Sequence, residues 1–303
     1  MNIPFIKYSK VWLVISSLIT LVCITFVIMW GLKPGIDFTG GSLLELSFTN
    51  RPESTEIQTV FEGLGIKNIS IQKTGDNGVI IRTNFLSEEE HQHVVSQLQS
   101  ELQASGNQVH EDSFQTIGSS ISSQLKSKAT WAVIFVNLGI IAYVAYAFRK
   151  VSRPVASWKY GVLAIVALLH DVLLVMGVFA VLGKFSGVEV DAAFVVAILT
   201  VLGYSVNDTI VVYDRIRENL QRHGNDSFVN VVNAGLNQTL MRSINTTFKT
   251  LLPLVALFFI GGASIHYFVL ALLIGIASGA YSSIFIAAPL LVIAYNWQER
   301  RKA

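Results

Sequence analysis

The segment GYSVNDTIVVYDRIREN, residues 203–219, places an Asn-Asp pair inside an apolar helix that then becomes densely charged. Ionisable groups inside a membrane span cost several kcal/mol, so they usually face a bundle interior or a water-filled path and carry function. The groups of this kind that fall inside apolar stretches are Asp171, Asp208, Arg242 and Lys249. Proton or ion transfer is the chemistry that such a set suggests.

Polar residues recur at helical spacing on two of these stretches. The first stripe contains Thr200, Gly203, Tyr204, Asn207, Asp208 and Arg215. The second contains Thr239, Arg242, Asn245, Thr246 and Lys249 and is followed by Pro253. With a rise of about 1.5 Å per residue, Asp208 and Arg242 fall on the same side of the membrane midplane and could meet.

A carboxylate beside a movable arginine changes its proton affinity when the arginine moves, which is how a proton relay works. A static Asp208–Arg242 pair, or an Asp208 held by helix hydroxyls, would instead only fix helix packing. The pattern favours the relay and leaves the static arrangement open. It does not separate H⁺ from Na⁺, because hydroxyl neighbours such as Ser205 and Thr209 suit either ion.

The composition indicates the scaffold that must hold these groups. Of 303 residues, 52% are hydrophobic and 14% charged, against about 25% charged in soluble proteins. A membrane span needs about 20 apolar residues, and six stretches come close: 11–31, 130–148, 161–182, 192–213, 240–260 and 267–296. We therefore expect an α-helical membrane bundle of six transmembrane helices with one extracytoplasmic α+β domain.

Small residues crowd the last span at Gly275, Ser278, Gly279, Ser282 and Ser283. Their spacing predicts a close helix contact. Cys23, the only cysteine, lies in the first span and permits no internal disulfide.

Orientation follows from the basic residues of the short loops. One side carries Lys7, Lys10, Arg149, Lys150, Arg153, Lys159, Arg215, Arg217, Arg222, Arg300, Arg301 and Lys302. The opposite short loops carry Lys184 alone. We therefore expect a multi-pass protein of the inner or plasma membrane with both termini cytoplasmic. The net charge of +2 is too small to indicate nucleic-acid binding.

The expected domains follow from these spans. Residues 1–31 form a cytoplasmic N-terminus and a first span that is retained as an anchor, because no small-residue cleavage site follows it. Residues 32–129 form the extracytoplasmic domain, 130–298 the five-helix transmembrane region and 299–303 a cytoplasmic tail.

The extracytoplasmic segment reads as strand, helix, two strands, helix and strand. The expected elements are 43–48, 53–64, 69–72, 78–83, a helix opened by the capping box of Ser87 and Glu90, and 108–117. This order is the split βαβ signature of a ferredoxin-like domain. The hairpin is expected to turn at Asp76-Asn77-Gly78, which tolerate positive φ.

Several kinds of chemistry lack sequence support. His91, His93 and His110 are expected to be solvated surface residues, because no tight ligand cluster accompanies them. The chain has no GxxxxGK[ST], HExxH or GxSxG motif. We therefore expect no metal, no cofactor and no enzymatic activity, so that any energy would come from an ion gradient.

Four segments carry a family resemblance: GIDFTGG at 35–41, the His170-Asp171 pair, 203–219 and NQTLMRSINTT at 237–247. They resemble the signature segments of the SecF family, within the RND superfamily, and the resemblance covers the whole chain in order. It implies an obligate partner half, SecD, and use of the proton-motive force to assist late protein translocation and release. It also implies the SecYEG channel, YajC and YidC as partners, SecA indirectly, unfolded secretory proteins as substrates and membrane lipid as surroundings.

The resemblance assigns roles residue by residue. It implies that Asp208 is the proton-path carboxylate and Arg242 its essential basic residue. Asn207, Thr246 and Lys249 would line the same path. His170 and Asp171 match a family segment and are possible accessory groups. Gly35, Asp37, Gly40 and Gly41 would shape the junction after the first span, with Asp37 as a turn acceptor.

Two rival functions stay open. The chain could be half of an RND-type exporter of small molecules or lipids, although its single small external domain disfavours this. It could also be a non-transducing scaffold of the translocon, which would have no need of Asp208 or Arg242.

Overall fold

The structure is a computed structural model that describes residues 3–103, 106–148, 155–222 and 226–301. It divides into two compact units: an extramembrane unit of residues 33–130 with 189–192, and a helical unit formed by the rest. The expected orientation partly rests on Arg149, Lys150, Arg153 and Lys302, which lie outside the described residues.

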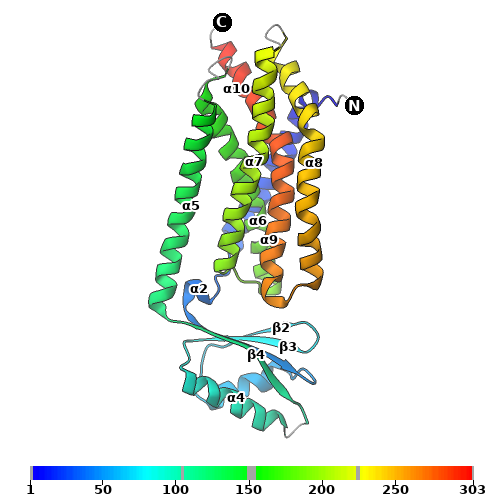
Figure 1. Cartoon of the computed structure of the whole chain (residues 1–303). Coiled ribbons are helices and arrows are strands. Elements are labelled where there is room, and N and C mark those ends of the chain that lie inside the picture. The colour runs from blue at the N-terminus through cyan, green and yellow to red at the C-terminus, as the bar shows by residue number, and fades with distance from the viewer. Residues whose placement is uncertain (1–2, 104–105, 149–154, 223–225, 302–303) are drawn as a thin grey trace. The chain divides into compact units, whose positions relative to one another are not determined.

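The helical unit is built from long helices that run alongside one another (Figure 1). Its elements are η1 (Ile6–Tyr8), α1 (Ser9–Trp30), most of α5 (Ser119–Ala147), α6 (Ser157–Ser186), α7 (Ala192–Arg222), α8 (Phe228–Ile260), α9 (Ala263–Ser282), the π-helical turn η2 (Ser283–Ala287) and α10 (Ala288–Arg300). Among the described residues, six helices are long and apolar enough to cross a membrane, and α9, η2 and α10 together make the last of them. The prediction of a six-helix membrane bundle is confirmed.

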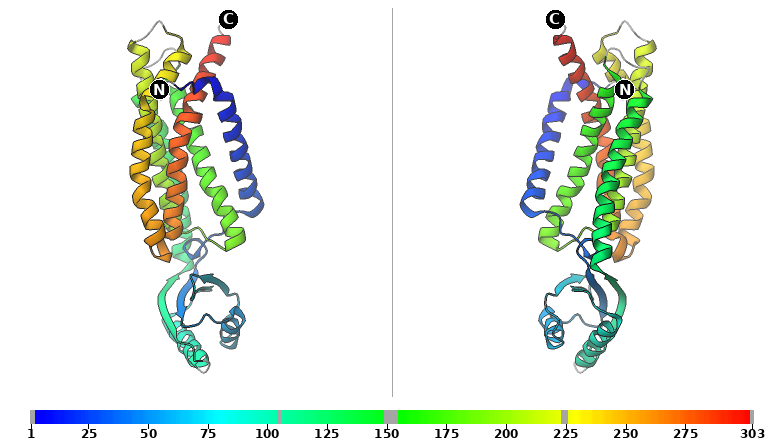
Figure 2. Two further views of the ribbon diagram at one scale, coloured as in Figure 1. Left: turned by 90° about the vertical axis from the view of Figure 1, so that its right-hand side faces the viewer. Right: turned by 90° about the vertical axis from the view of Figure 1, so that its left-hand side faces the viewer.

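Helix packing in this unit depends on small residues. A Cβ atom added at Gly275 would lie 2.2 Å from Cγ2 of Val201, and one at Gly279 would lie 2.8 Å from Cβ of Ser205. The predicted close contact of the last span is therefore confirmed, and α7 is its partner. Elsewhere α1 packs against α6 (Figure 2), and α9 packs against both α6 and α8.

The extramembrane unit contains a four-stranded sheet. Its elements are α2 (Ile36–Thr39), β1 (Gly41–Phe48), α3 (Ser54–Gly63), β2 (Ser70–Thr74), β3 (Gly78–Thr83), α4 (Glu88–Gln103) and β4 (Val109–Ile117). The strand order is β2-β3-β1-β4, and every neighbouring pair is antiparallel. Both the element order and the strand order agree with the predicted split βαβ arrangement.

Alternation along the strands builds the core of this unit. Leu44, Leu46 and Phe48 of β1 face the same side of the sheet, where α3 and α4 cover them. Ile57 and Phe61 of α3 are fully buried against that face.

Local details confirm one prediction and correct another. The capping box is present: the Ser87 backbone N–H and hydroxyl both donate to Glu90, at 2.8 and 2.9 Å, and they lower the pKa of that carboxyl from its ordinary value. In the β2–β3 hairpin the left-handed residue is Gly75, with φ of 51°, so the expectation of positive φ in Asp76-Asn77-Gly78 is wrong. Gly75 directly follows Thr74, the last paired residue of β2, and is therefore the position where the chain must turn.

One of the three histidines is not a surface residue. His93 and His110 are exposed, but His91 is only 6% exposed and stacks on Phe114 with ring centroids 3.7 Å apart. Its Nε2 lies 3.1 Å from Glu111. The helix face that carries His91 is covered by β4, which the spacing of the histidines did not reveal.

A glycine pair makes the entry into β1. Gly40 has φ of 74° and Gly41 has φ of 120°, a region that L side chains rarely adopt. A Cβ at Gly41 would also lie 2.5 Å from the backbone oxygen of Thr83.

We predict that Gly41→Ala destabilises the extramembrane unit by at least about 1–3 kcal/mol, because the new Cβ combines backbone strain with a clash against backbone. Pulse proteolysis of the purified full chain across a urea series measures this. The control is Gly63→Ala, where an added Cβ meets nothing within 4 Å and where the change should stay within about 1 kcal/mol. Equal stability of the two variants would contradict the prediction.

Candidate functional site

Asp208 is buried in the helical unit, with 6% of its surface exposed. The Ser243 hydroxyl of α8 donates to its Oδ1 and the Ser283 hydroxyl of η2 donates to its Oδ2, each at 2.9 Å. Three helical elements therefore meet at this carboxylate, and both oxygens are held by neutral hydroxyls.

Arg242 does not pair directly with Asp208. No ion pair between described residues includes Arg242 or Lys249, and both side chains are exposed on α8. Successive residues of a helix point about 100° apart. Since Ser243 faces Asp208, its neighbour Arg242 points about 100° to one side of that contact.

The other predicted path residues are also exposed. Asn207 of α7 and Thr246 of α8 are exposed. The Thr246 hydroxyl donates to the backbone oxygens of Arg242 and Ser243, at 2.9 and 3.0 Å. We call six exposed polar residues of these two helices the outer polar face: Thr200, Asn207, Arg242, Asn245, Thr246 and Lys249.

Asp171 of α6 is the centre of a second cluster and is completely buried. Three serine hydroxyls donate to it at 2.6 Å each: Ser278 to Oδ1, and Ser205 and Ser282 to Oδ2. Nδ1 of His170 lies 3.1 Å from Oδ1. A carboxylate accepts about four hydrogen bonds, so Asp171 is fully satisfied by α6, α7 and α9.

The two carboxylates are joined through consecutive residues of the last span. Ser282, the final residue of α9, donates to Asp171, and Ser283, the first residue of η2, donates to Asp208. Single π-helical turns inside α-helices are rare and occur frequently at functional sites. A change in the hydrogen bonding of either carboxylate therefore acts on the same turn of the same helix.

The sequence pattern missed the donors. It favoured Arg242 as the partner of Asp208 and left helix hydroxyls as an alternative without identifying them, whereas the direct partners are the hydroxyls of Ser243 and Ser283. Ser278, Ser282 and Ser283 were interpreted as packing residues only. A signal was present, because Ser278 and Ser282 are four residues apart on one helix face, but serine at that spacing is equally typical of close helix contact.

The predicted junction residues Gly35, Asp37, Gly40 and Gly41 belong to the extramembrane unit. Oδ2 of Asp37 accepts the backbone N–H of Ala192, the first residue of α7, at 2.7 Å. Asp37 thus caps a helix 155 positions away in sequence.

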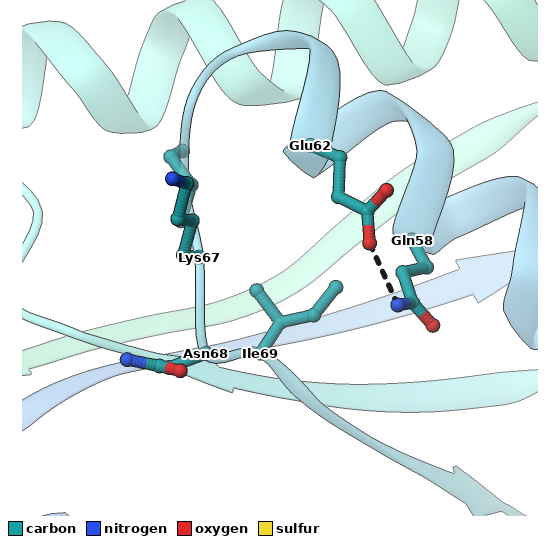
Figure 3. A pocket seen from close by; sticks show the side chains of 6 residues that line it. Gln58, Glu62, Lys67, Asn68 and Ile69 are labelled. Carbon is teal, nitrogen blue, oxygen red and sulfur yellow. Dashed lines mark hydrogen bonds between the residues drawn. The ribbon is translucent and has the colours of Figure 1, made fainter.

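Other sites are few in the part of the chain that the structure describes. No group of three or more His, Cys, Asp or Glu side chains there could hold a metal ion. A surface pocket lies beside the end of α3 and the start of β2 (Figure 3), and Gln58 donates to Glu62 across its wall at 2.8 Å. It contains none of the predicted site residues.

These features define a multi-pass membrane protein with buried carboxylates in its bundle and one α+β extramembrane domain. The chain belongs to the SecD/SecF family: the family model described as protein export membrane protein SecD/SecF, C-terminal, matches residues 97–297. The model of the SecD/SecF GG motif matches residues 31–50.

Individual relatives agree with this assignment. The chain is 39% identical to the protein translocase subunit SecF of Thermobaculum terrenum, over 98% of this chain and 95% of that one. It is 40% identical to SecF of Synechocystis, over 98% and 96%. The crystal structure of SecDF from Thermus thermophilus matches with a TM-score of 0.84 and 32% identity, and covers 99% of this chain. The chain spans only 39% of that SecDF chain.

We predict that Asp171→Ala destabilises the helical unit by about 2 kcal/mol, because the serine hydrogen bonds it removes are worth about 0.6 kcal/mol each inside a membrane and the hydroxyls lose their acceptor. Asp171→Asn, which keeps an acceptor oxygen, should cost less. Unfolding of the purified chain by SDS titration in mixed micelles gives the comparison.

The control for this series is Asp214→Ala, at an exposed position of α7 where Asp214 pairs with Arg217 at 2.8 Å. An exposed pair contributes less than about 1 kcal/mol. If Asp171→Ala were no more destabilising than the control, the hydroxyl cluster would not hold the helices together.

Proposed function

We propose that the chain acts as the SecF half of a SecD–SecF unit, which uses the proton-motive force to promote late steps of protein translocation and release outside the membrane. One observation carries the proposal. Asp208 is a buried carboxylate in a membrane helix, and its direct partners are the neutral hydroxyls of Ser243 and Ser283.

Serine partners suit a group that gains and loses a proton. A hydroxyl can donate to a carboxylate or accept from a carboxyl group. Asp208 can therefore keep hydrogen bonds to Ser243 and Ser283 in both protonation states if the hydroxyls rotate. A guanidinium only donates, so Arg242 favours the charged form of a nearby carboxylate alone.

The outer polar face supports a partner half. Arg242 and Lys249 lie in a membrane span without an ion pair among the described residues. Cations in such positions face a bundle interior or a water-filled path rather than lipid. A second set of helices that covers this face, and contributes a carboxylate, would satisfy both.

SecD is the partner that we propose for this face. SecDF of Brucella abortus is 36% identical to this chain over 96% of its length, and the match takes up 37% of that protein. Relatives of this chain thus exist inside a longer chain called SecDF, which supports a partnership of two halves. Asn207, Thr246 and Lys249 would line the path between the halves, with His170 and Asp171 as accessory groups.

The proposed orientation has both termini in the cytoplasm and residues 32–129 outside, on the strength of the basic residues in the short loops. In that orientation the extramembrane unit lies where secretory chains emerge unfolded. SecYEG, YajC and YidC are the proposed neighbours, with SecA acting indirectly from the cytoplasm. The coupling ion is proposed to be H⁺, and Na⁺ is the alternative.

We predict that Asp208→Asn slows the release of a secreted protein outside the membrane by about tenfold or more while the complex still assembles. Asn cannot exchange a proton but keeps an acceptor for Ser243 or Ser283. The measurement is pulse-chase labelling of a secreted protein in cells that contain SecD and lack the wild-type chain. Release at the wild-type rate would leave the site as packing and the chain as a scaffold.

Two controls complete that experiment. Asp214→Asn, at the exposed end of the same helix, should release substrate at the wild-type rate. Dissipating either the proton or the sodium gradient in wild-type cells identifies the ion, since only the coupled gradient should matter. Export of small amphiphiles instead of proteins would favour the exporter alternative.

We predict that the outer polar face contacts SecD. A photo-crosslinking amino acid at Asn245 should give a SecD adduct in membranes, because Asn245 is exposed on α8 beside Arg242. The same probe at Phe259, which is 78% exposed near the end of α8, is the control for collision in the lipid. Equal adduct yields at the two positions would argue against a specific partner face.

A further inference from the structure

The GG segment and the loop that leads into α7 are joined as backbone. Gly35 N–H donates to the carbonyl of Val190 and Val190 N–H donates to the carbonyl of Lys33, each at 2.8 Å, so that Pro34 and Val190 form a parallel bridge. We call residues 33–41 together with 189–192 the GG clamp. All of its residues belong to the extramembrane unit.

Charged side chains tie the loop to the sheet. Glu189, whose side chain is 10% exposed, lies 2.6 Å from Nε of Arg82 on β3 and 3.3 Å from Nζ of Lys33. Nη1 of Arg82 also donates to Gln72 of β2 at 3.0 Å. The loop is therefore held to an inner strand of the sheet and not only to the segment beside it.

The last contact of the clamp is made with α7 itself. Asp37 accepts the N–H of Ala192 at 2.7 Å, and this residue is the first of the helix. A carboxylate at a helix N-terminus satisfies a free N–H and complements the helix dipole. From Ala192 the helix continues without interruption to Arg222 and carries Asp208.

Glycines stand where the clamp is tightest. A Cβ at Gly35 would lie 3.3 Å from the Val190 carbonyl oxygen, and Gly40 and Gly41 have positive φ. The conformation that brings Asp37 to α7 is thus set by the GG segment rather than by a flexible linker.

We propose that the GG clamp is the coupling element that fixes the first turn of α7 to the extramembrane unit, with Asp37 and Glu189 as its positioning residues. Displacement of α7 then moves the extramembrane unit, and force on that unit reaches α7. The coupling to ion flow rests on the proposed function of Asp208; the mechanical link does not.

The test opens the clamp and then closes it by another bond. In Asp37→Ala/Glu189→Ala, hydrogen exchange of the first-turn amides of α7 should accelerate at least tenfold in the full complex, and release of a secreted protein should slow at least fivefold. Asp76→Ala/Glu89→Ala, at exposed positions of the same unit, is the matched control and should leave both unchanged.

Closure uses Pro34→Cys/Val190→Cys in a Cys23→Ala background, because bridged residues have the Cα spacing that a disulfide needs. Added to the open clamp, the oxidised pair should restore release to within twofold of wild type, and a reductant should abolish the rescue. Each single cysteine is a control and should not rescue.

The outcomes distinguish mechanical coupling through the GG clamp from a purely structural role in folding. Normal release with the clamp open would overturn the proposal, and so would slow release that the disulfide fails to restore although exchange is normal. If Asp208→Asn exports at the wild-type rate while the clamp variants slow and are rescued, the ion coupling fails and the mechanical link stands. If Asp208→Asn slows release and the open clamp does not, the link alone fails.

Discussion

A charge inside a membrane bundle has to be given partners, and the hydrogen bonds to Asp171 and Asp208 meet that requirement here. Asp171 accepts from three serines on α7 and α9, and Asp208 accepts from serines on α8 and η2. Because each hydroxyl is short, the helices must approach closely. Gly275 and Gly279 allow α9 to reach α7 at the depth where Ser205 meets Asp171. The glycines of the last span therefore allow the close approach that its serines need in order to reach the buried carboxylates.

The two carboxylates differ in how much of their hydrogen-bonding capacity is used. Asp171 accepts from three serine hydroxyls, has Nδ1 of His170 3.1 Å from its Oδ1, and is completely buried. Asp208 accepts hydrogen bonds from two hydroxyls, those of Ser243 and Ser283. A saturated carboxylate is suited to holding helices in register, whereas an unsaturated one retains capacity for a proton or an ion. The shared turn at Ser282 and Ser283 makes the first the natural support of the second.

The extramembrane unit obeys a different constraint, which is conformational. Its entry depends on left-handed glycines at 40 and 41, and its exit to α7 depends on an ion pair and a helix cap. The unit thus contains both the strand that follows the first span and Asp37, which accepts the N–H of the first residue of α7. The GG motif matched at residues 31–50 acquires a physical meaning from this arrangement.

The sequence by itself determined the elements and the presence of a carboxylate, Asp208, inside a membrane helix. Apolar runs of membrane length, strand alternation and the Ser87–Glu90 cap are local signals, and a lone Asp in an apolar helix is conspicuous because its insertion is costly. Only the tertiary structure decided the partners. The rotation of each helix about its axis is set by packing. Packing therefore decided that Ser243 and not Arg242 contacts Asp208, and that His91 is buried against Phe114. The Asp37–Ala192 contact spans 155 positions, and a contact at that separation leaves no periodic trace in the chain because it depends on how distant segments are brought together.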